Sequence, residues 1–353
     1  MINQEVKPTI FKDEAELASL KEKLINFQYI DAFERQLKEL FFIDNKQYIG
    51  TDKETAYQTE DFKKYCETKK DHFNYIFYPW NQTIVKCAQI NDFLTLKTNR
   101  NQDLITSAEQ EILRNFKIGV FGMSVGSNIA FVLTQAGISN KIAIADFDEL
   151  DTTNLNRILA GTHQIGLNKT TIAARHIYED NPYAEVTTFD QGINVENLEK
   201  LLANKEIDCI IEEIDEMTMK IETRKLALKY KVPVVMITDN GDGVVLHIER
   251  YDLGYDKIFE KDEAYWQQKL SGPMGKELAG DIIINDIVGG MHQVDPKMIA
   301  SVGRVMKKEL VSWSQLGSAA ILGGVVATYA IKQIAVGDNK TFFVREYINL
   351  PKF

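Results

Sequence analysis

The stretch KIGVFGMSVGSNIAFVLTQAGISNKIAIADFDELDTTNLNR, residues 117–157, decides the fold. It opens with an apolar run over residues 117–121 that is typical of a buried strand. Residues 127–135 then have the apolar spacing of a helix, which Gly137 ends, and a second strand follows over residues 141–148. This order predicts parallel strands joined by a helix that covers one face of the sheet.

The same alternation continues toward the C-terminus. Further strands are expected at residues 185–189, 208–215, 232–238, 243–250 and 341–350, and further helices at residues 168–179, 222–230 and 313–333. We therefore predict an α/β fold with a doubly wound, Rossmann-like, mostly parallel sheet over residues 101–353. Residues 254–308, with their GPMG and VGG segments, are expected to form a loop-rich insertion.

The first hundred residues have a different pattern, which predicts an α+β accessory region. Residues 13–40 show helical apolar spacing, and residues 45–71 are polar. Two strand-like runs follow at residues 74–80 and 82–90. We expect residues 1–100 to form an N-terminal accessory region, with partner recognition as its candidate role.

The composition is that of a folded globular protein. Apolar residues make up 44% of the 353 residues, and charged residues make up 26%. A formal charge of −10 argues against a nucleic-acid partner. The N-terminus lacks the apolar core of a signal peptide, so we expect a cytoplasmic protein. Residues 311–331 are long and uncharged enough to span a membrane, but their polar side chains favour a buried or interface helix.

The turn after the first strand has the features of a phosphate-binding loop. Gly122, Ser124, Gly126 and Ser127 are small residues that let the backbone turn sharply and approach a phosphate. The helix that follows offers free N–H groups and partial positive charge. Asp146 ends the next strand, 20 residues after Gly126, which is the separation expected of a carboxylate that binds ribose hydroxyls. The loop therefore predicts nucleotide binding.

The loop also contains G-x-S-x-G, the nucleophile-elbow pattern of α/β-hydrolases. A hydrolase would use Ser124 as its nucleophile and Asp215 as the acid of a triad. His247 or His292 would complete that triad. No HGGG-type segment precedes the serine, and Asp146 would have no role, so the pattern favours a nucleotide loop over a hydrolase.

Amide and cationic side chains follow the second strand. Asn154, Arg157 and Lys169 lie beyond Asp146 and Asp148 in the chain. When a carboxylate attacks the α-phosphate of ATP, negative charge builds on the phosphoryl oxygens and on the departing pyrophosphate, and fixed cations lower that barrier. Arg157 can bind two oxygens with its planar guanidinium, and Lys169 supplies a point charge. A dehydrogenase has no use for this trio.

Four segments together resemble the ThiF-type adenylyltransferases, which are related to ubiquitin-activating enzymes. They are GMSVGS (122–127), DFDELDTTNLNR (146–157), IGLNK (165–169) and EEIDE (212–216). The resemblance extends over residues 96–350. It implies that ATP and Mg²⁺ bind and that a carboxylate is activated as an acyl-adenylate with release of pyrophosphate. The family's carboxylates imply a peptide or a small-protein C-terminus as the substrate.

The resemblance also assigns roles to residues of the nucleotide site. It implies that Asp146 binds ribose and that Asn154 and Arg157 contact phosphate. Lys169 corresponds to a lysine on ATP, and Asp215 corresponds to the aspartate that holds Mg²⁺. The predicted site thus combines these residues with the glycine loop and Asp148.

Two further features imply a homodimer. Arg100 resembles an arginine that reaches the nucleotide of the neighbouring subunit in dimeric members of the family. The helix at residues 313–333 resembles the one that closes the sheet and meets a partner subunit. A homodimer is therefore expected.

The cysteines narrow the chemistry. No cysteine follows Cys209, so the thioester cysteine of activating enzymes has no counterpart, and transfer without an enzyme thioester is expected. The chain has no CxxC pair, so we predict no zinc.

Two other function classes stay open. The glycine loop and Asp146 also suit an NAD-binding oxidoreductase. Departures from the family pattern, such as Glu216 in place of the usual Asn, also suit a catalytically inactive ThiF-like module that binds a peptide. Asp239, Asp242 and His247 follow a strand end, where ligands of parallel sheets collect, but the sequence assigns them no role.

Overall fold

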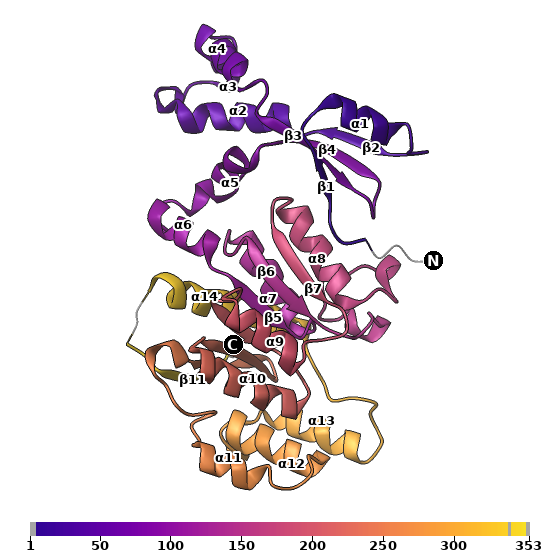
Figure 1. Ribbon diagram of the computed structural model, residues 1–353, viewed down its shortest axis with the longest axis vertical. Coiled ribbons are helices and arrows are strands. Elements are labelled where there is room, and N and C mark those ends of the chain that lie inside the picture. The colour runs from indigo at the N-terminus through magenta and orange to yellow at the C-terminus, as the bar shows by residue number, and fades with distance from the viewer. Residues whose placement is uncertain (1–4, 338–339, 351–353) are drawn as a thin grey trace. The chain divides into compact units, whose positions relative to one another are not determined.

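The computed structural model describes residues 5–337 and 340–350 and divides into two compact units (Figure 1). The first unit comprises Met1–Ser107 together with Asn181–Tyr183, and the second comprises Ala108–Asp180 and Ala184–Phe353. Each unit has its own sheet.

The first unit is a four-stranded sheet with five α-helices in its described residues. The strand order is β1-β3-β4-β2. The strands are β1 (Thr9–Phe11), β2 (Gln28–Asp31), β3 (Phe73–Tyr78) and β4 (Thr83–Ala88). The helices are α1 (Glu14–Lys21), α2 (Phe33–Asp44), α3 (Lys53–Tyr57), α4 (Glu60–Lys69) and α5 (Ile90–Thr98). Tyr183 belongs to this unit because its hydroxyl donates to the carbonyl of Ala88 at 2.6 Å.

The expected single helical pattern over residues 13–40 is wrong. Residues Gln28–Asp31 form β2, which pairs in parallel with β4 and separates α1 from α2. The apolar residues here recur at three-residue steps, but their backbone groups are used by the neighbouring strand, so sheet pairing overrides the helical spacing. The polar stretch at residues 45–71 contains α3 and α4, which Asp52 and Thr59 cap at their N-termini.

The second unit contains a seven-stranded sheet in the order β11-β10-β9-β8-β5-β6-β7. Its strands are β5 (Ile118–Phe121), β6 (Lys141–Ala145), β7 (Glu185–Phe189), β8 (Cys209–Glu212), β9 (Val234–Asn240), β10 (Gly243–Glu249) and β11 (Phe343–Ile348). Strands β5 to β9 run parallel, whereas β10 is antiparallel to both of its neighbours. The predicted doubly wound, mostly parallel sheet is therefore confirmed.

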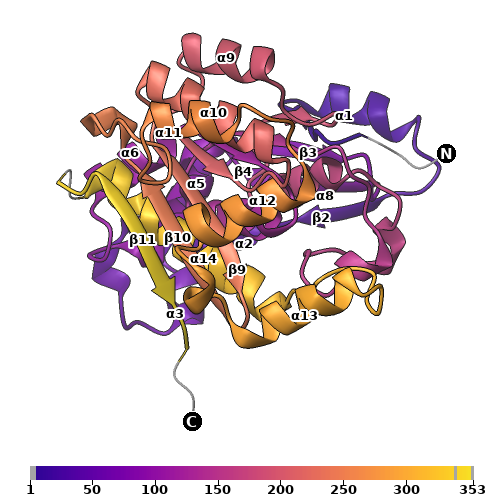
Figure 2. The ribbon, with the colours of Figure 1, turned by 90° about the horizontal axis from the view of Figure 1, so that it is seen from below.

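Helices cover both faces of this sheet (Figure 2). The main ones are α6 (Ser107–Asn115), α7 (Val125–Gln135), α8 (Lys169–Asp180), α9 (Val195–Ala203), α10 (Met217–Tyr230) and α14 (Gly317–Val336). Leucines of α9 and α10 pack with Phe121 and Ile210 on one face. On the other face, Gly323 of α14 lies against Val125 and Ile237 because it has no side chain. The glycine loop, residues 122–127, follows the carboxyl end of β5, which lies between β8 and β6 in the sheet.

The segment at residues 254–308 is not the loop-rich insertion that its glycines predict. It forms α11 (Glu263–Lys269), α12 (Lys276–Asp281), a π-helix (Ile282–Ile287) and α13 (Pro296–Met306). Trp266 and Ile282 are buried against Met217 of α10 and Met236 of β9. The helices are short, and their apolar residues pack onto this core, so the sequence lacks a long amphipathic repeat.

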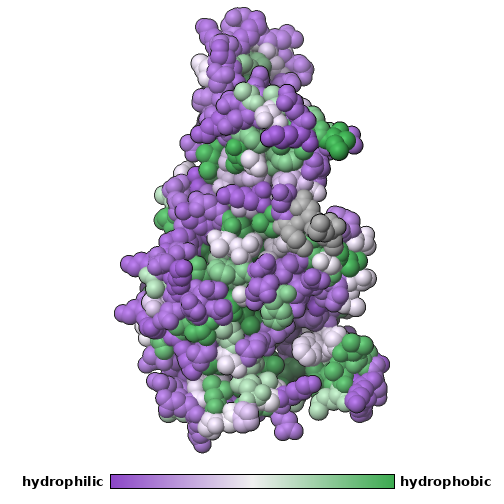
Figure 3. All heavy atoms as spheres, turned by 45° about the vertical axis from the view of Figure 1, so that its right-hand side comes forward, coloured by the Kyte–Doolittle hydropathy of each residue, from purple (hydrophilic) through white to green (hydrophobic). Residues whose placement is uncertain are grey.

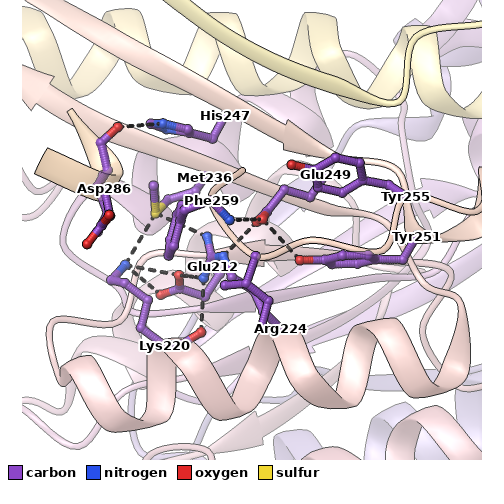
Figure 4. Close-up of polar contacts among 12 residues, drawn as sticks. Glu212, Lys220, Arg224, Met236, His247, Glu249, Tyr251, Tyr255, Phe259 and Asp286 are labelled. Atoms are coloured by element: carbon purple, nitrogen blue, oxygen red, sulfur yellow. Dashed lines mark hydrogen bonds and ion pairs between the residues drawn. The ribbon is translucent and has the colours of Figure 1, made fainter. Parts of the chain in front are cut away.

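A buried ion network ties α10 to the sheet (Figure 4). Arg224 donates to Glu212 and to Glu249, each at 2.6 Å, and none of the three side chains is accessible to solvent. Lys220 completes the network with a 2.9 Å bond to Glu212. The ring of Phe259 lies 3.9 Å from the Arg224 guanidinium carbon. The insertion therefore covers a paired cluster of charges.

Helix α14 is long and apolar enough to cross a membrane, judged by length and composition alone. Half of its most apolar 18 residues are buried within the unit. The core helix of a globular protein can have the same length and apolar composition, so α14 is only a weak indication of a membrane span. The face of the molecule in Figure 3 is mostly hydrophilic, with separate hydrophobic patches.

Candidate nucleotide site

The turn between β5 and α7 is shaped to hold a phosphate. Gly122 has a φ of +99°, and a Cβ there would clash with the carbonyl oxygen of Glu213, so only glycine fits. Ser124 is the N-cap of α7 but makes no side-chain capping bond, which leaves the N–H groups of the first turn without a side-chain cap. Ser127 donates to the Ser124 carbonyl at 2.9 Å. Such a helix start is suited to bind an anion.

The carboxylate of Asp146 fastens the end of β6 to this loop. It accepts from the backbone N–H of Met123 at 2.6 Å and from that of Asp148 at 2.8 Å. Burial raises the pKa of Asp146, and these two N–H groups lower it in part. The predicted ribose ligand thus lies beside the phosphate loop.

Arg157 reaches the same loop from the segment after β6. Its Nε–H donates to the Ser124 hydroxyl at 3.1 Å. Its Nη1 donates to the carbonyl of Thr153 at 3.2 Å and to Asn156 at 2.9 Å. Burial lowers the pKa of Arg157, while the charges of Asp239 and Asp215 raise it. Because an arginine stays protonated in proteins, a fixed positive charge faces the start of α7.

Asn154 and Lys169 occupy different positions around this charge. The Asn154 side chain accepts from the N–H of Asp151 at 3.0 Å and closes a capping box, so it shapes the turn that leads to Arg157. Lys169 begins α8, is only 7% exposed, and donates to Asp148 at 2.7 Å. A phosphate that draws on Lys169 must compete with this ion pair.

Asp215 is exposed just after β8, and its charge acts on Arg157. In the described part of the chain, no group of three or more His, Cys, Asp or Glu residues could hold a metal ion. Mg²⁺ commonly binds one or two carboxylates together with substrate phosphates, so Asp215 alone fits that kind of site.

The structure does not assemble the hydrolase triad. The Ser124 hydroxyl accepts from Arg157, whereas His247 is 1% exposed in β10 and bonds to the carbonyl of Ile287 at 2.8 Å. Cys209 is fully buried in β8, and burial raises the pKa of its thiol, so it is not a nucleophile. Arg100 lies in a 3₁₀ turn of the first unit, Asn99–Asn101, and its role stays a prediction.

Sequence reasoning left two carboxyl groups of this site unassigned. Glu213 follows β8 and accepts from the N–H of Ile237 at 2.7 Å, which joins the end of β8 to the middle of β9. Asp239 lies near the end of β9, and both of its carboxylate oxygens are buried without a hydrogen-bond partner among the described residues. The position of Asp239 near the end of an apolar strand marks it as a candidate ligand residue. The sequence does not show that its carboxylate is buried.

Residues 96–349 match the ThiF family. The chain belongs to the ThiF family. The matches do not favour the NAD-binding oxidoreductase that the sequence left open.

Two relatives are similar in sequence to this ThiF chain. An uncharacterized protein of Mycobacterium tuberculosis is 30% identical over 276 residues, which cover 74% of this chain and 36% of that protein. The tRNA threonylcarbamoyladenosine dehydratase of Bacillus subtilis is 30% identical over 139 residues, 39% of this chain and 54% of that enzyme. The chain therefore spans about a third to a half of these relatives.

A crystal structure shares the fold of this ThiF chain. It is the tRNA N6-threonylcarbamoyladenosine dehydratase TcdA of E. coli in complex with AMP. The TM-score is 0.50 at 18% identity, and the match covers 68% of this chain and 94% of that one.

Proposed function

We propose that this protein is an ATP-dependent adenylyltransferase that activates a carboxylate as an acyl-adenylate and releases pyrophosphate. The observation that carries the proposal is the bond from Arg157 to Ser124, which fixes a cation at the uncapped start of α7. A cation beside free N–H groups suits a polyphosphate better than a neutral ligand.

The geometry suggests how each residue acts. The first turn of α7 binds a phosphate, Asp146 orients the ribose, and Arg157 takes up charge on the phosphoryl oxygens. Asp215 would hold Mg²⁺, which supplies charge neutralisation on the phosphates when bound. The substrate carboxylate attacks the α-phosphorus while the bond to pyrophosphate breaks, and no general base is required because the attacking group is already ionised at neutral pH.

Lys169 adds a second cation once it leaves Asp148. In the ligand-free protein its ammonium group is 2.7 Å from that carboxylate. A triphosphate carries more negative charge than one carboxylate, so it competes for the lysine. Arg100 would complete the phosphate contacts from a partner subunit.

The substrate carboxylate is proposed to be the C-terminus of a peptide or a small protein. The first unit is a separate compact unit with its own sheet, which suits it to recognise such a partner. The acyl group would pass to an external nucleophile because Cys209 is buried and no cysteine follows it. Both steps would take place in the cytoplasm.

A homodimer is proposed through α14. Ile321, Val325 and Tyr329 recur every four residues on one side of the helix and are 56%, 52% and 59% exposed. An apolar stripe of this kind on a long helix is commonly covered by a partner subunit. Light scattering should report a dimer at micromolar concentration, and a monomer would contradict this proposal.

Pyrophosphate release tests the proposed function. The assay combines the protein with ATP, Mg²⁺ and a library of peptides that have free C-termini. Arg157→Ala and Asp215→Ala should abolish the release that any active peptide supports, whereas Arg304→Ala, an exposed arginine paired with Glu309, should not. Tight peptide binding without pyrophosphate release would instead favour the inactive peptide-binding module.

A further inference from the structure

Asp239 is a buried carboxylate at the edge of the nucleotide site, and none of the residues that the structure describes donates a hydrogen bond to it. It lies next to the last residue of β9 and opposite Val244 of β10. Neither carboxylate oxygen has a hydrogen-bond partner within residues 5–337 and 340–350. A buried carboxylate normally needs such donors, so this group is costly to keep ionised.

The attractive charge that acts on Asp239 comes from Arg157. Glu213 and Asp215, which follow β8, and the nearby Asp242 and Asp295 are all acidic. The part of α14 beside β9, residues 317–331, carries no charge, and neither does Val244. The ionised form of Asp239 therefore depends on one guanidinium.

That guanidinium is also the proposed phosphate ligand. Burial raises the pKa of the Asp239 carboxyl to about 6, and Arg157 lowers it in part. A bound triphosphate would share the positive charge of Arg157 and add negative charge nearby. Both effects disfavour a second, unpartnered anion in the same place.

We propose that Asp239 is coupled to nucleotide binding through the charge of Arg157: the guanidinium favours the ionised carboxyl while the site is open, and Asp239 takes up a proton when a triphosphate binds. An O–H bond forms on the Asp239 carboxyl, the proton comes from the buffer, and Arg157 keeps its own protons for the phosphate. This inference rests on the proposed binding of ATP.

The proposal makes nucleotide affinity depend on pH. In the ligand-free protein Asp239 ionises as the pH rises. Above that pH, each further pH unit should weaken ATP binding by up to about tenfold, because Asp239 must take up a proton when ATP binds. Asp239→Asn cannot ionise and should bind ATP more tightly than the unchanged protein at neutral pH. The ATP affinity of Asp239→Asn at several pH values also shows how much of the pH dependence comes from titration of the nucleotide itself.

Calorimetry tests the proton uptake directly. ATP with excess Mg²⁺ is titrated into the full chain at neutral pH in two buffers, PIPES and Tris, that differ in ionisation enthalpy. The unchanged protein and the Asp242→Asn control, an exposed aspartate in the adjoining turn, should take up part of a proton per ATP. Asp239→Asn should take up none. Equal uptake in Asp239→Asn and the unchanged protein would overturn the inference.

Carboxyl ¹³C NMR tests the link to Arg157 without relying on turnover. The Asp239 signal, assigned by its loss in Asp239→Asn, should titrate at higher pH when ATP is bound. It should also titrate at higher pH in ligand-free Arg157→Gln, and an unchanged titration in that variant would overturn the role of Arg157.

If Asp239→Asn does not fold, the proton uptake of the unchanged protein is measured by calorimetry at a series of pH values. No uptake at any pH would contradict the inference. Failure of the unchanged protein to bind ATP would overturn the proposed function as well, whereas ATP binding without proton uptake would overturn only this inference.

Discussion

Arg157 and Ser124 meet at the start of α7, where the Nε–H of the arginine donates to the serine hydroxyl at 3.1 Å. The two residues are 33 positions apart and come from different segments. The bond therefore joins the loop that follows β6 to the loop that follows β5. It also explains why a serine in the middle of the glycine loop suits this site without acting as a nucleophile.

Ser124→Ala should weaken the site without unfolding the protein. The change removes one hydrogen bond to a charged group, worth about 1–3 kcal/mol, so Arg157 is less firmly held. We expect the KM for ATP to rise by about tenfold in pyrophosphate release, with an unchanged melting temperature. Ser271→Ala, an exposed serine that bonds to the carbonyl of Gln268, serves as the control. An unchanged KM would show that the bond does not position Arg157.

Gly122→Ala should destabilise the protein and disrupt the loop. The backbone there has a φ of +99°, and the new Cβ would clash with the carbonyl oxygen of Glu213. Strain of this kind costs on the order of 1–3 kcal/mol before any rearrangement. Urea unfolding should show the loss, and ATP binding should fall in the folded fraction. Gly272→Ala is the matched control, because a Cβ there meets no atom within 4 Å. A fully stable Gly122→Ala variant would contradict the steric argument.

The second unit, with its seven-stranded sheet, could be predicted from sequence because the patterns that indicate its strands and helices are local. Apolar runs such as residues 118–121 stand next to small residues at a turn, and the spacing from Gly126 to Asp146 reflects one strand–helix–strand unit. The sequence predicts that Arg157 and Ser124 belong to the same site. It does not predict the hydrogen bond between them, because that geometry depends on how the two loops pack.

Other parts were not predictable because tertiary contacts decide them. β2 forms because β4 offers a free edge, although its residues continue a helical spacing. Residues 254–308 fold into short helices because Trp266 and Ile282 find a partner surface on the sheet. Asp239 was visible as a strand-end aspartate, but its missing donors depend on side chains far away in the sequence.

Arg224→Met should strongly destabilise the fold. Arg224 is the shared partner of Glu212 and Glu249, and all three side chains have no solvent exposure. Removing the arginine leaves Glu249 without its cation and Glu212 with Lys220 alone, which typically costs about 3–5 kcal/mol. Chemical denaturation should measure this loss. Lys225→Met, at an exposed pair with Glu222, should change stability by less than about 1 kcal/mol. Equal effects of the two changes would contradict the importance of burial.

Asp239→Asn should stabilise the protein at neutral pH while it changes nucleotide binding. Burial raises the pKa of this carboxyl to about 6 in the folded state, against about 3.9 in an unfolded chain. The folded state therefore holds this proton more tightly, so the stabilising contribution is complete below about pH 4 and is lost as the pH rises through 6. The amide cannot ionise, so the variant avoids that loss, which amounts to at most about 3 kcal/mol.

Urea unfolding at acidic and at neutral pH measures this difference, because all other titrating groups are shared by the two proteins. The stability of Asp239→Asn relative to the unchanged protein should increase between about pH 4 and pH 8. The exposed Asp242→Asn should show no such trend. A variant that loses stability as the pH rises would mean that the ionised carboxylate is stabilised by contacts other than Arg157. Stabilisation together with altered ATP binding would instead mark Asp239 as a residue kept for the site and not for the fold.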